Sequence, residues 1–180
     1  MLLTWSRMAV CPVFVVFLSM EGAIWGWLAA GLFVIASITD WFDGYLARKY
    51  DAISNMGKFM DPIADKILVA SVLIMLIPLQ RVDTLLVILL LSRDIFIGGS
   101  RSVAAADRVI IDAKAAGKWK TGLQMVAIPA LLIHDPALGL PLYEIGRVLL
   151  WVSVVLSIFS GAQYTNLYFQ SRRDAMNAKP

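Results

Sequence analysis

The chain has 180 residues, of which 59% are apolar and 16% charged, and its formal net charge is +3. Its mean hydropathy of +0.75 excludes a soluble single domain. With one cysteine, Cys11, and one histidine, His134, the sequence excludes an intramolecular disulfide and argues against Cys/His zinc sites and Ser-His or Cys-His nucleophile pairs.

Six apolar runs follow one another along the chain, separated by glycine, proline or charged residues. They cover roughly Ala9–Met20, Ile24–Tyr45, Phe59–Ile77, Thr84–Ser100, Leu123–Ile133 with its flanks, and Gly146–Tyr168. A bilayer crossing takes about 20 apolar residues, so six crossings use roughly 120 positions and leave room only for short loops and a tail. The sequence therefore predicts an all-α polytopic membrane protein with six transmembrane helices.

The chain is expected to form one transmembrane catalytic domain over residues 1–168. Residues 169–180 are expected to be a cytoplasmic tail, disordered or derived in part from cloning. Thr165–Ser171 differs at one position from ENLYFQS, the site of a common processing protease. For that reason Asn166 onward carries no functional argument.

Lysine and arginine residues gather in alternate connections. They lie in or beside the second connection, in the fourth and in the tail: Arg48, Lys49, Lys58; Arg101, Arg108, Lys114, Lys118, Lys120; Arg172, Arg173, Lys179. Because basic loops stay on the cytoplasmic side, both termini and the even-numbered loops are predicted to face the cytoplasm. Attraction to lipid headgroups is an alternative explanation of the same charges.

Four aspartates border the second connection: Asp40, Asp43, Asp61 and Asp65. An aspartate at the centre of a spanning helix costs about 2.5 to 3.5 kcal/mol, so something must compensate these four. At about 100° per residue, Asp40 and Asp43 share one helix face with Gly44 and Ala47. Asp61 and Asp65, four residues apart, share a face of the next helix. Two neighbouring helices could therefore point four carboxylates at one space.

Cations between these carboxylates would relieve a repulsion of roughly 3 kcal/mol for each pair about 5 Å apart. Since only oxygen ligands are available, hard ions such as Mg²⁺ or Mn²⁺ are favoured over zinc. In the alternative interpretation, Asp61 and Asp65 are loop-flanking charges that complement a helix N-terminus. Gly44 and Gly57 lack a Cβ, which lets a phosphate-bearing ligand approach the backbone; a packing role is the alternative for each.

The spacing from Asp40 to Asp65 resembles the CDP-alcohol phosphatidyltransferase signature DxxDGxxAR(x)8GxxxDxxxD at every fixed position. The resemblance implies that the four aspartates hold two divalent metal ions and that Asp65 is also the general base. It implies that the cytidine diphosphate site is lined by Gly44, Ala47, Arg48 and Gly57.

The same resemblance implies a reaction and a cellular place. An alcohol hydroxyl would attack the lipid-side phosphorus of CDP-diacylglycerol, and CMP would leave. The implied protein is a homodimer in the bacterial cytoplasmic membrane, with its active site facing the cytoplasm. Its partners would be membrane lipids and not nucleic acid.

Four basic residues are candidates for binding the acceptor alcohol: Arg93, Arg101, Lys118 and Lys120. Arg93 and Arg101 lie roughly 80° apart around one predicted helix, and the two lysines begin the next, so the four could converge. An arginine inside the bilayer normally needs an anionic partner. For Arg93 that partner could be a ligand phosphate, or simply Asp94 or another buried carboxylate.

The segments RDIFIGGSR and GKWKT resemble the phosphatidylglycerophosphate synthases, a branch of this family, with Asp94 where glutamate is more usual. We therefore expect glycerol 3-phosphate as the acceptor, since a dianion suits a pocket of arginine and lysine. Inositol phosphate would exploit the same cations, and serine or phosphatidylglycerol are further alternatives. A divalent-cation channel or transporter is the rival from another class, but it leaves the small residues and the basic loop unexplained.

Overall fold

The computed structural model describes the backbone of residues 2–49, 55–106, 115–133 and 140–177. Side chains are described for residues 9–39, 42, 66–104, 119–133, 140–171 and 173. Within these ranges the protein is all-helical, with six helices in chain order: α1 (Leu2–Ser19), α2 (Ala23–Lys49), α3 (Asn55–Leu76), α4 (Thr84–Ala106), α5 (Ala115–Leu132) and α6 (Leu142–Asn177).

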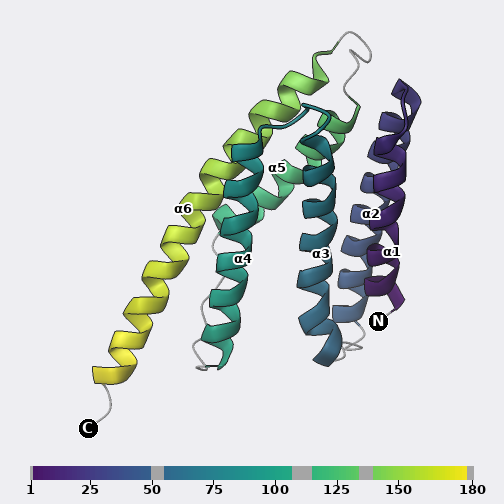
Figure 1. The fold of residues 1–180 in the computed structure, drawn as a ribbon. Helices are drawn as coiled ribbons and strands as arrows, with labels where there is room; N and C mark the ends of the chain where they lie inside the picture. The colour runs from purple at the N-terminus through teal and green to yellow at the C-terminus, as the bar shows by residue number, and fades with distance from the viewer. Residues whose placement is uncertain (1, 50–54, 107–114, 134–139, 178–180) are drawn as a thin grey trace.

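The helices form an elongated bundle in which α1, α2 and α3 lie side by side and α6 leans across the opposite flank (Figure 1). The closest packing is between α5 and α6, and α1 packs against both α3 and α2. Helix α5 also contacts α2, and α4 contacts α6, so α5 and α6 connect the two flanks.

Consecutive helices alternate in direction. Figure 1 shows the N- and C-terminal ends of the chain at the same end of the bundle as the last turn of α2 and the first turn of α3. At the other end, Gly22 has a φ of 116° between α1 and α2, a left-handed conformation that suits glycine because it has no Cβ. The first turn of α1, the last turn of α2, the first turn of α3, the last turn of α4 and the last turn of α6 therefore lie toward the same end of the bundle, and which side of a membrane that end faces stays a prediction.

The core is apolar and lies mainly among α1, α2, α3, α4 and α5, with α6 closing it. Its largest fully buried side chains include Phe14, Phe33, Leu73, Leu86 and Ile128. The rings of Phe14 and Phe33 meet edge to face, with centroids 6.3 Å apart and planes at 68°. This contact fixes α1 against α2.

The outer surface is also apolar. Large side chains stand exposed on the helices, among them Ile95 at 72%, Ile35 at 64% and Val155 at 63%. Soluble monomers rarely expose apolar surface on this scale. By length and composition, one stretch among the described residues is long and apolar enough to cross a membrane, Leu142–Ser171; Ala9–Ser19, Ala23–Thr39 and Lys66–Leu76 are shorter apolar segments.

Helix bounds differ from the apolar runs mainly at polar ends. Helix α5 begins at Ala115, eight residues before the predicted run, and continues through Pro129 to Leu132. Helix α6 continues past residue 168 to Asn177, so the described part of the predicted tail extends the last helix. The extra turns are polar, and a hydropathy pattern does not register them.

Candidate active site

The residues of the aspartate signature lie on two successive helices. Asp40, Asp43, Gly44, Ala47 and Arg48 belong to the last turns of α2, and Gly57, Asp61 and Asp65 belong to the first turns of α3. Their side chains lie outside the described ranges, so the convergence of the four carboxylates stays a prediction. Among the side chains that are described, no group of three or more His, Cys, Asp or Glu residues is placed to hold a metal ion.

The helix bounds nevertheless show how far each aspartate pair lies from the end of its helix. Counted from Lys49, the last residue of α2, Asp43 and Asp40 lie about 9 and 14 Å along the helix axis. Counted from Asn55, the first residue of α3, Asp61 and Asp65 lie about 9 and 15 Å along theirs. Each pair therefore lies within three turns of a helix end, and both helix ends are at the same end of the bundle (Figure 1). Their oxygen donors suit hard divalent ions.

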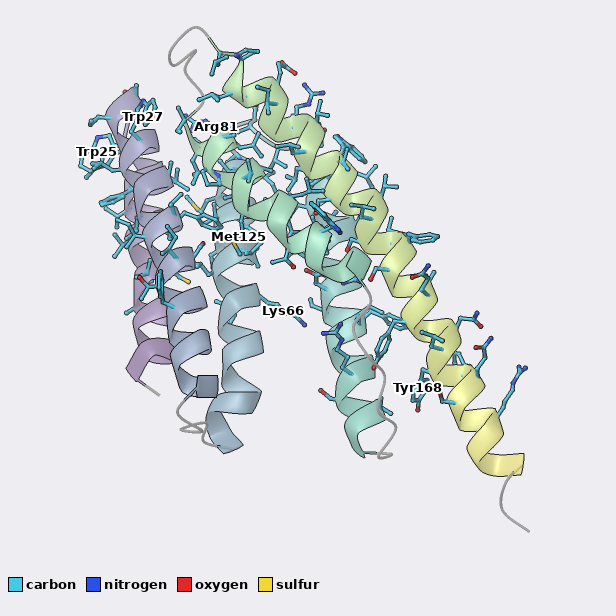
Figure 2. The ribbon with its side chains drawn as sticks, turned by 180° about the vertical axis from the view of Figure 1, so that it is seen from behind. Trp25, Trp27, Lys66, Arg81, Met125 and Tyr168 are labelled. Atoms are coloured by element: carbon cyan, nitrogen blue, oxygen red, sulfur yellow. The ribbon has the colours of Figure 1, made fainter. Side chains whose placement is uncertain are left out.

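A described polar cluster is centred on Asp94 of α4. Its carboxylate oxygen Oδ1 accepts a hydrogen bond from Arg93 Nη1 at 3.0 Å and another from Lys120 Nζ on α5. Its backbone carbonyl accepts one from Lys66 Nζ on α3 at 2.9 Å. Figure 2 shows Lys66 extending from α3 toward α4. Three helices thus contribute cations around one aspartate, and we call Lys66, Arg93, Asp94 and Lys120 the Asp94 cluster.

Helix α6 forms a further wall of this cluster. Arg93 Nε donates to the carbonyl of Ser157 at 2.7 Å. A Cβ added to Gly161, one turn further along α6, would lie 3.2 Å from Arg93 Nε, so the glycine leaves room for the guanidinium. Ser153 Oγ donates to the backbone carbonyl of Lys120 at 3.3 Å, which ties α6 to α5 at the same level.

The four residues expected to bind the acceptor are placed differently. The structure brings Arg93 and Lys120 together on Asp94, so the alternative partner considered for Arg93 is in contact with it. Arg101 lies about 12 Å further along α4, with its guanidinium 5.6 Å from the centre of the Tyr164 ring. Lys118 lies on α5, and its side chain falls outside the described ranges.

Sequence reasoning missed Lys66. The signal was present, since Lys66 directly follows Asp65 and is the one basic residue in the predicted run Phe59–Ile77. Its partner is a backbone carbonyl 28 residues away, and no residue pattern encodes such a contact.

Two buried polar atoms near this level lack hydrogen-bond partners among the described residues. They are Gln124 Nε2, one turn after Lys120, and the hydroxyl of Ser157. An unpaired buried polar group typically costs about 1 to 3 kcal/mol. The wall of the Asp94 cluster therefore contains donors that the described residues do not satisfy.

Comparison with known proteins identifies the family. The profile of the CDP-alcohol phosphatidyltransferase family matches residues 1–159. The chain belongs to this family.

Curated relatives cover nearly the whole chain. A protein of Rickettsia typhi is 39% identical over 163 residues, which is 90% of this chain and 92% of the relative. A protein of Bacillus subtilis is 37% identical over 175 residues, 90% of each chain. A protein of Haemophilus influenzae is 36% identical over 169 residues, 90% of this chain and 88% of the relative. All three are named CDP-diacylglycerol--glycerol-3-phosphate 3-phosphatidyltransferase.

Proposed function

We propose that this CDP-alcohol phosphatidyltransferase uses glycerol 3-phosphate as its acceptor and makes phosphatidylglycerophosphate and CMP from CDP-diacylglycerol. The observation that carries the proposal is the similarity, over nine-tenths of the chain, to relatives named for this reaction. The Asp94 cluster supports it, because three cations around one carboxylate suit the phosphate of this acceptor.

The chemistry assigned to the chain is a single group transfer. A hydroxyl oxygen of glycerol 3-phosphate forms a bond to the lipid-side phosphorus of CDP-diacylglycerol. The bond from that phosphorus to the bridging pyrophosphate oxygen breaks, and CMP leaves with the electron pair. Asp65 accepts the hydroxyl proton, a role that a carboxylate can fill when one of its oxygens faces the acceptor.

The remaining signature residues bind the nucleotide end. Two divalent ions, Mg²⁺ or Mn²⁺, would be held by Asp40, Asp43, Asp61 and Asp65 and would neutralise the pyrophosphate oxygens when bound. Gly44, Ala47 and Gly57 let the cytidine diphosphate approach the backbone of α2 and α3. Arg48 pairs with its phosphate oxygens.

The protein is placed in the cytoplasmic membrane as six transmembrane helices, with both termini and the signature residues on the cytoplasmic side. The exposed apolar side chains on α2, α4 and α6 support this placement, since a bilayer covers such a surface without cost. A homodimer completes the proposal, and its mass in detergent, measured by light scattering, tests that part.

The decisive experiment gives the purified protein CDP-diacylglycerol together with one acceptor at a time and measures CMP release. The acceptors are glycerol 3-phosphate, inositol phosphate, serine and phosphatidylglycerol. We expect turnover with glycerol 3-phosphate, and its loss when EDTA removes divalent ions. Turnover confined to another acceptor would refute the choice of acceptor and leave the reaction class intact.

A further inference from the structure

Among the side chains that the structure describes, the charges of the Asp94 cluster do not balance. Lys66, Arg93 and Lys120 are cations, and Asp94 is the anion they share, so positive charges exceed negative ones by two among these residues. The side chains of Arg93 and Asp94 are 16% and 15% exposed, and that of Lys120 is 7% exposed. Burial of uncompensated charge is costly, so such a cluster favours an anion beside it.

The donors of the cluster are also incompletely used. An ammonium group carries three N–H donors, and among the described residues Lys66 and Lys120 each donate one hydrogen bond. The Ser157 hydroxyl, which has no partner in the described part of the chain, belongs to the residue whose carbonyl accepts from Arg93. Donors from α3, α4, α5 and α6 thus lie at one level, where a tetrahedral oxyanion can accept several of them.

We infer that Lys66 is a third cation of the acceptor-phosphate site and that Asp94 is the positioning residue that gathers its cations. The inference rests on the proposed function and deepens it by assigning two residues that the family signature does not contain. Asp94 binds Arg93 and Lys120 through its carboxylate and Lys66 through its carbonyl, so it fixes the spacing of all three.

Lys66 also links the proposed phosphate site to the proposed general base. It is adjacent in sequence to Asp65, the proposed general base, and successive Cα atoms lie 3.8 Å apart. The hydrogen bond from Lys66 to the Asp94 carbonyl therefore fixes the base-bearing turn of α3 against the phosphate-binding turn of α4. A phosphate held by these cations would therefore lie beside the turn of α3 that carries the proposed base.

The test compares Lys66→Met with Arg81→Met. Arg81 is a matched control, because it too donates to a backbone carbonyl of a distant helix, that of Leu132 at 2.7 Å; it lies near one end of the bundle, whereas Lys66 lies midway along α3. For Lys66→Met we expect the KM for glycerol 3-phosphate to rise about 10-fold or more, the range for one charge-assisted hydrogen bond. The KM for CDP-diacylglycerol should stay unchanged, and the inhibition constant of inorganic phosphate should rise in parallel.

Arg81→Met should leave both KM values and phosphate inhibition unchanged. If Lys66→Met leaves the KM for glycerol 3-phosphate and the phosphate inhibition unchanged, Lys66 only joins α3 to α4 and the inference is overturned. Equal changes in Lys66→Met and Arg81→Met would overturn it too, because a merely structural effect does not separate the two sites.

Asp94 is tested by Asp94→Asn and by Asp94→Glu. The amide keeps the shape but loses the charge that holds Arg93 and Lys120, so the KM for glycerol 3-phosphate should rise. The longer carboxylate should restore most of the wild-type KM; if Asp94→Glu has a KM no lower than that of Asp94→Asn, the positioning role is refuted. If Asp94→Asn does not fold, the KM values of Lys66→Met and Asp94→Glu for glycerol 3-phosphate test the inference.

Failure of the inference is distinguishable from failure of the proposed function. If the wild-type protein turns over inositol phosphate and not glycerol 3-phosphate, the acceptor is wrong, and a Lys66 effect on inositol phosphate still supports the phosphate site. If the wild-type protein uses glycerol 3-phosphate and its Lys66→Met variant has an unchanged KM, the proposed function stands and the inference fails.

Discussion

Two contacts of the same kind, each from a cation to a backbone carbonyl, have different surroundings in this protein. Arg81, in the turn between α3 and α4, donates to the backbone carbonyl of Leu132, and Lys66 of α3 donates to that of Asp94. Leu132 is the last residue of α5, where carbonyls have no partner within the helix, so Arg81 completes a helix end. Asp94 lies inside α4, and Lys66 there joins two further cations.

The two contacts have the same chemical type and differ in the charged groups around them. At the Arg81 end, a half-buried cation stabilises the junction between the α3–α4 turn and α5. At the Asp94 cluster, cations accumulate beyond what their carboxylate neutralises. We therefore expect substitutions at the Asp94 end to change activity more than stability, and substitutions at the Arg81 end to do the reverse.

The largest effect on turnover is expected for a substitution in the aspartate signature of α2 and α3. Asp61→Asn should lower turnover by at least about 100-fold, since disturbing even the outer partners of metal ligands costs 10- to 100-fold. The folded protein should remain extractable with an unchanged melting temperature. CMP release and thermal unfolding in detergent measure the two quantities, and full activity would count against metal binding by Asp61.

At the Arg81 end, Gly26→Ala should reduce stability and leave both KM values unchanged. A Cβ at Gly26 would lie 2.5 Å from the carbonyl oxygen of Leu132, a backbone atom that cannot move aside freely. The clash should cost about 1 to 3 kcal/mol of unfolding free energy. Gly31→Ala on the same helix meets nothing within 4 Å and serves as the control, with stability equal to or above wild type. Equal melting temperatures for the two variants would contradict the close approach of α2 and α5.

A third variant moves Arg93 without removing it. Gly161→Ala places a Cβ 3.2 Å from Arg93 Nε, so the guanidinium must shift by a few tenths of an ångström. We expect the KM for glycerol 3-phosphate to rise by up to about 10-fold, because small displacements of a binding group weaken positioning. Gly122→Ala, which meets nothing within 4 Å, is the control for an added methyl group. Should both variants bind the acceptor like wild type, Arg93 does not contact it.

The smallest effect is expected for Ser157→Ala. The Ser157 hydroxyl is buried without a partner among the described residues, so its removal should raise the unfolding free energy by up to about 1 kcal/mol. Thermal unfolding without ligand measures this gain. In the presence of glycerol 3-phosphate the gain should shrink, if the hydroxyl donates to the bound phosphate; a gain that is the same with and without acceptor would exclude that contact.

Much of the fold could be predicted from the sequence, because each helix contains one apolar run. The run Thr84–Ser100 begins at the same residue as α4, and Ile24–Tyr45 lies inside α2. The apolar runs do not include the last turn of α2 or the first turns of α5. Helical hydrogen bonds continue through these polar residues, but a hydropathy pattern records only apolar ones. Those turns carry Arg48 and Lys118, so the least predictable helix ends include predicted site residues.

The site was predictable to a different degree at each residue. Fixed spacing identified the aspartates on α2 and α3, because helical periodicity makes such a pattern specific. Arg93 was singled out as a charge inside a predicted bilayer helix, Lys120 through the GKWKT segment, and Asp94 as an alternative partner for Arg93. The structure brings the three together, and acceptor binding by them stays a prediction. Lys66 was not found, because its role depends on a carbonyl that tertiary packing alone brings near.

Helix α6 is one continuous helix that is attached to the rest of the bundle at two points about 9 Å apart along its axis. Trp151 Nε1 donates to Asp83 Oδ2 at 3.3 Å near the α3–α4 turn, while the Ser157 carbonyl holds Arg93. Its apolar stretch Leu142–Ser171 is about 45 Å long, against a hydrocarbon layer of roughly 30 Å, so in a bilayer it has to tilt. Because α6 also contacts Arg93, we expect the tilt of α6, and with it the position of Arg93, to depend on the thickness of the surrounding bilayer. Reconstitution with lipids of one acyl-chain length keeps that thickness constant.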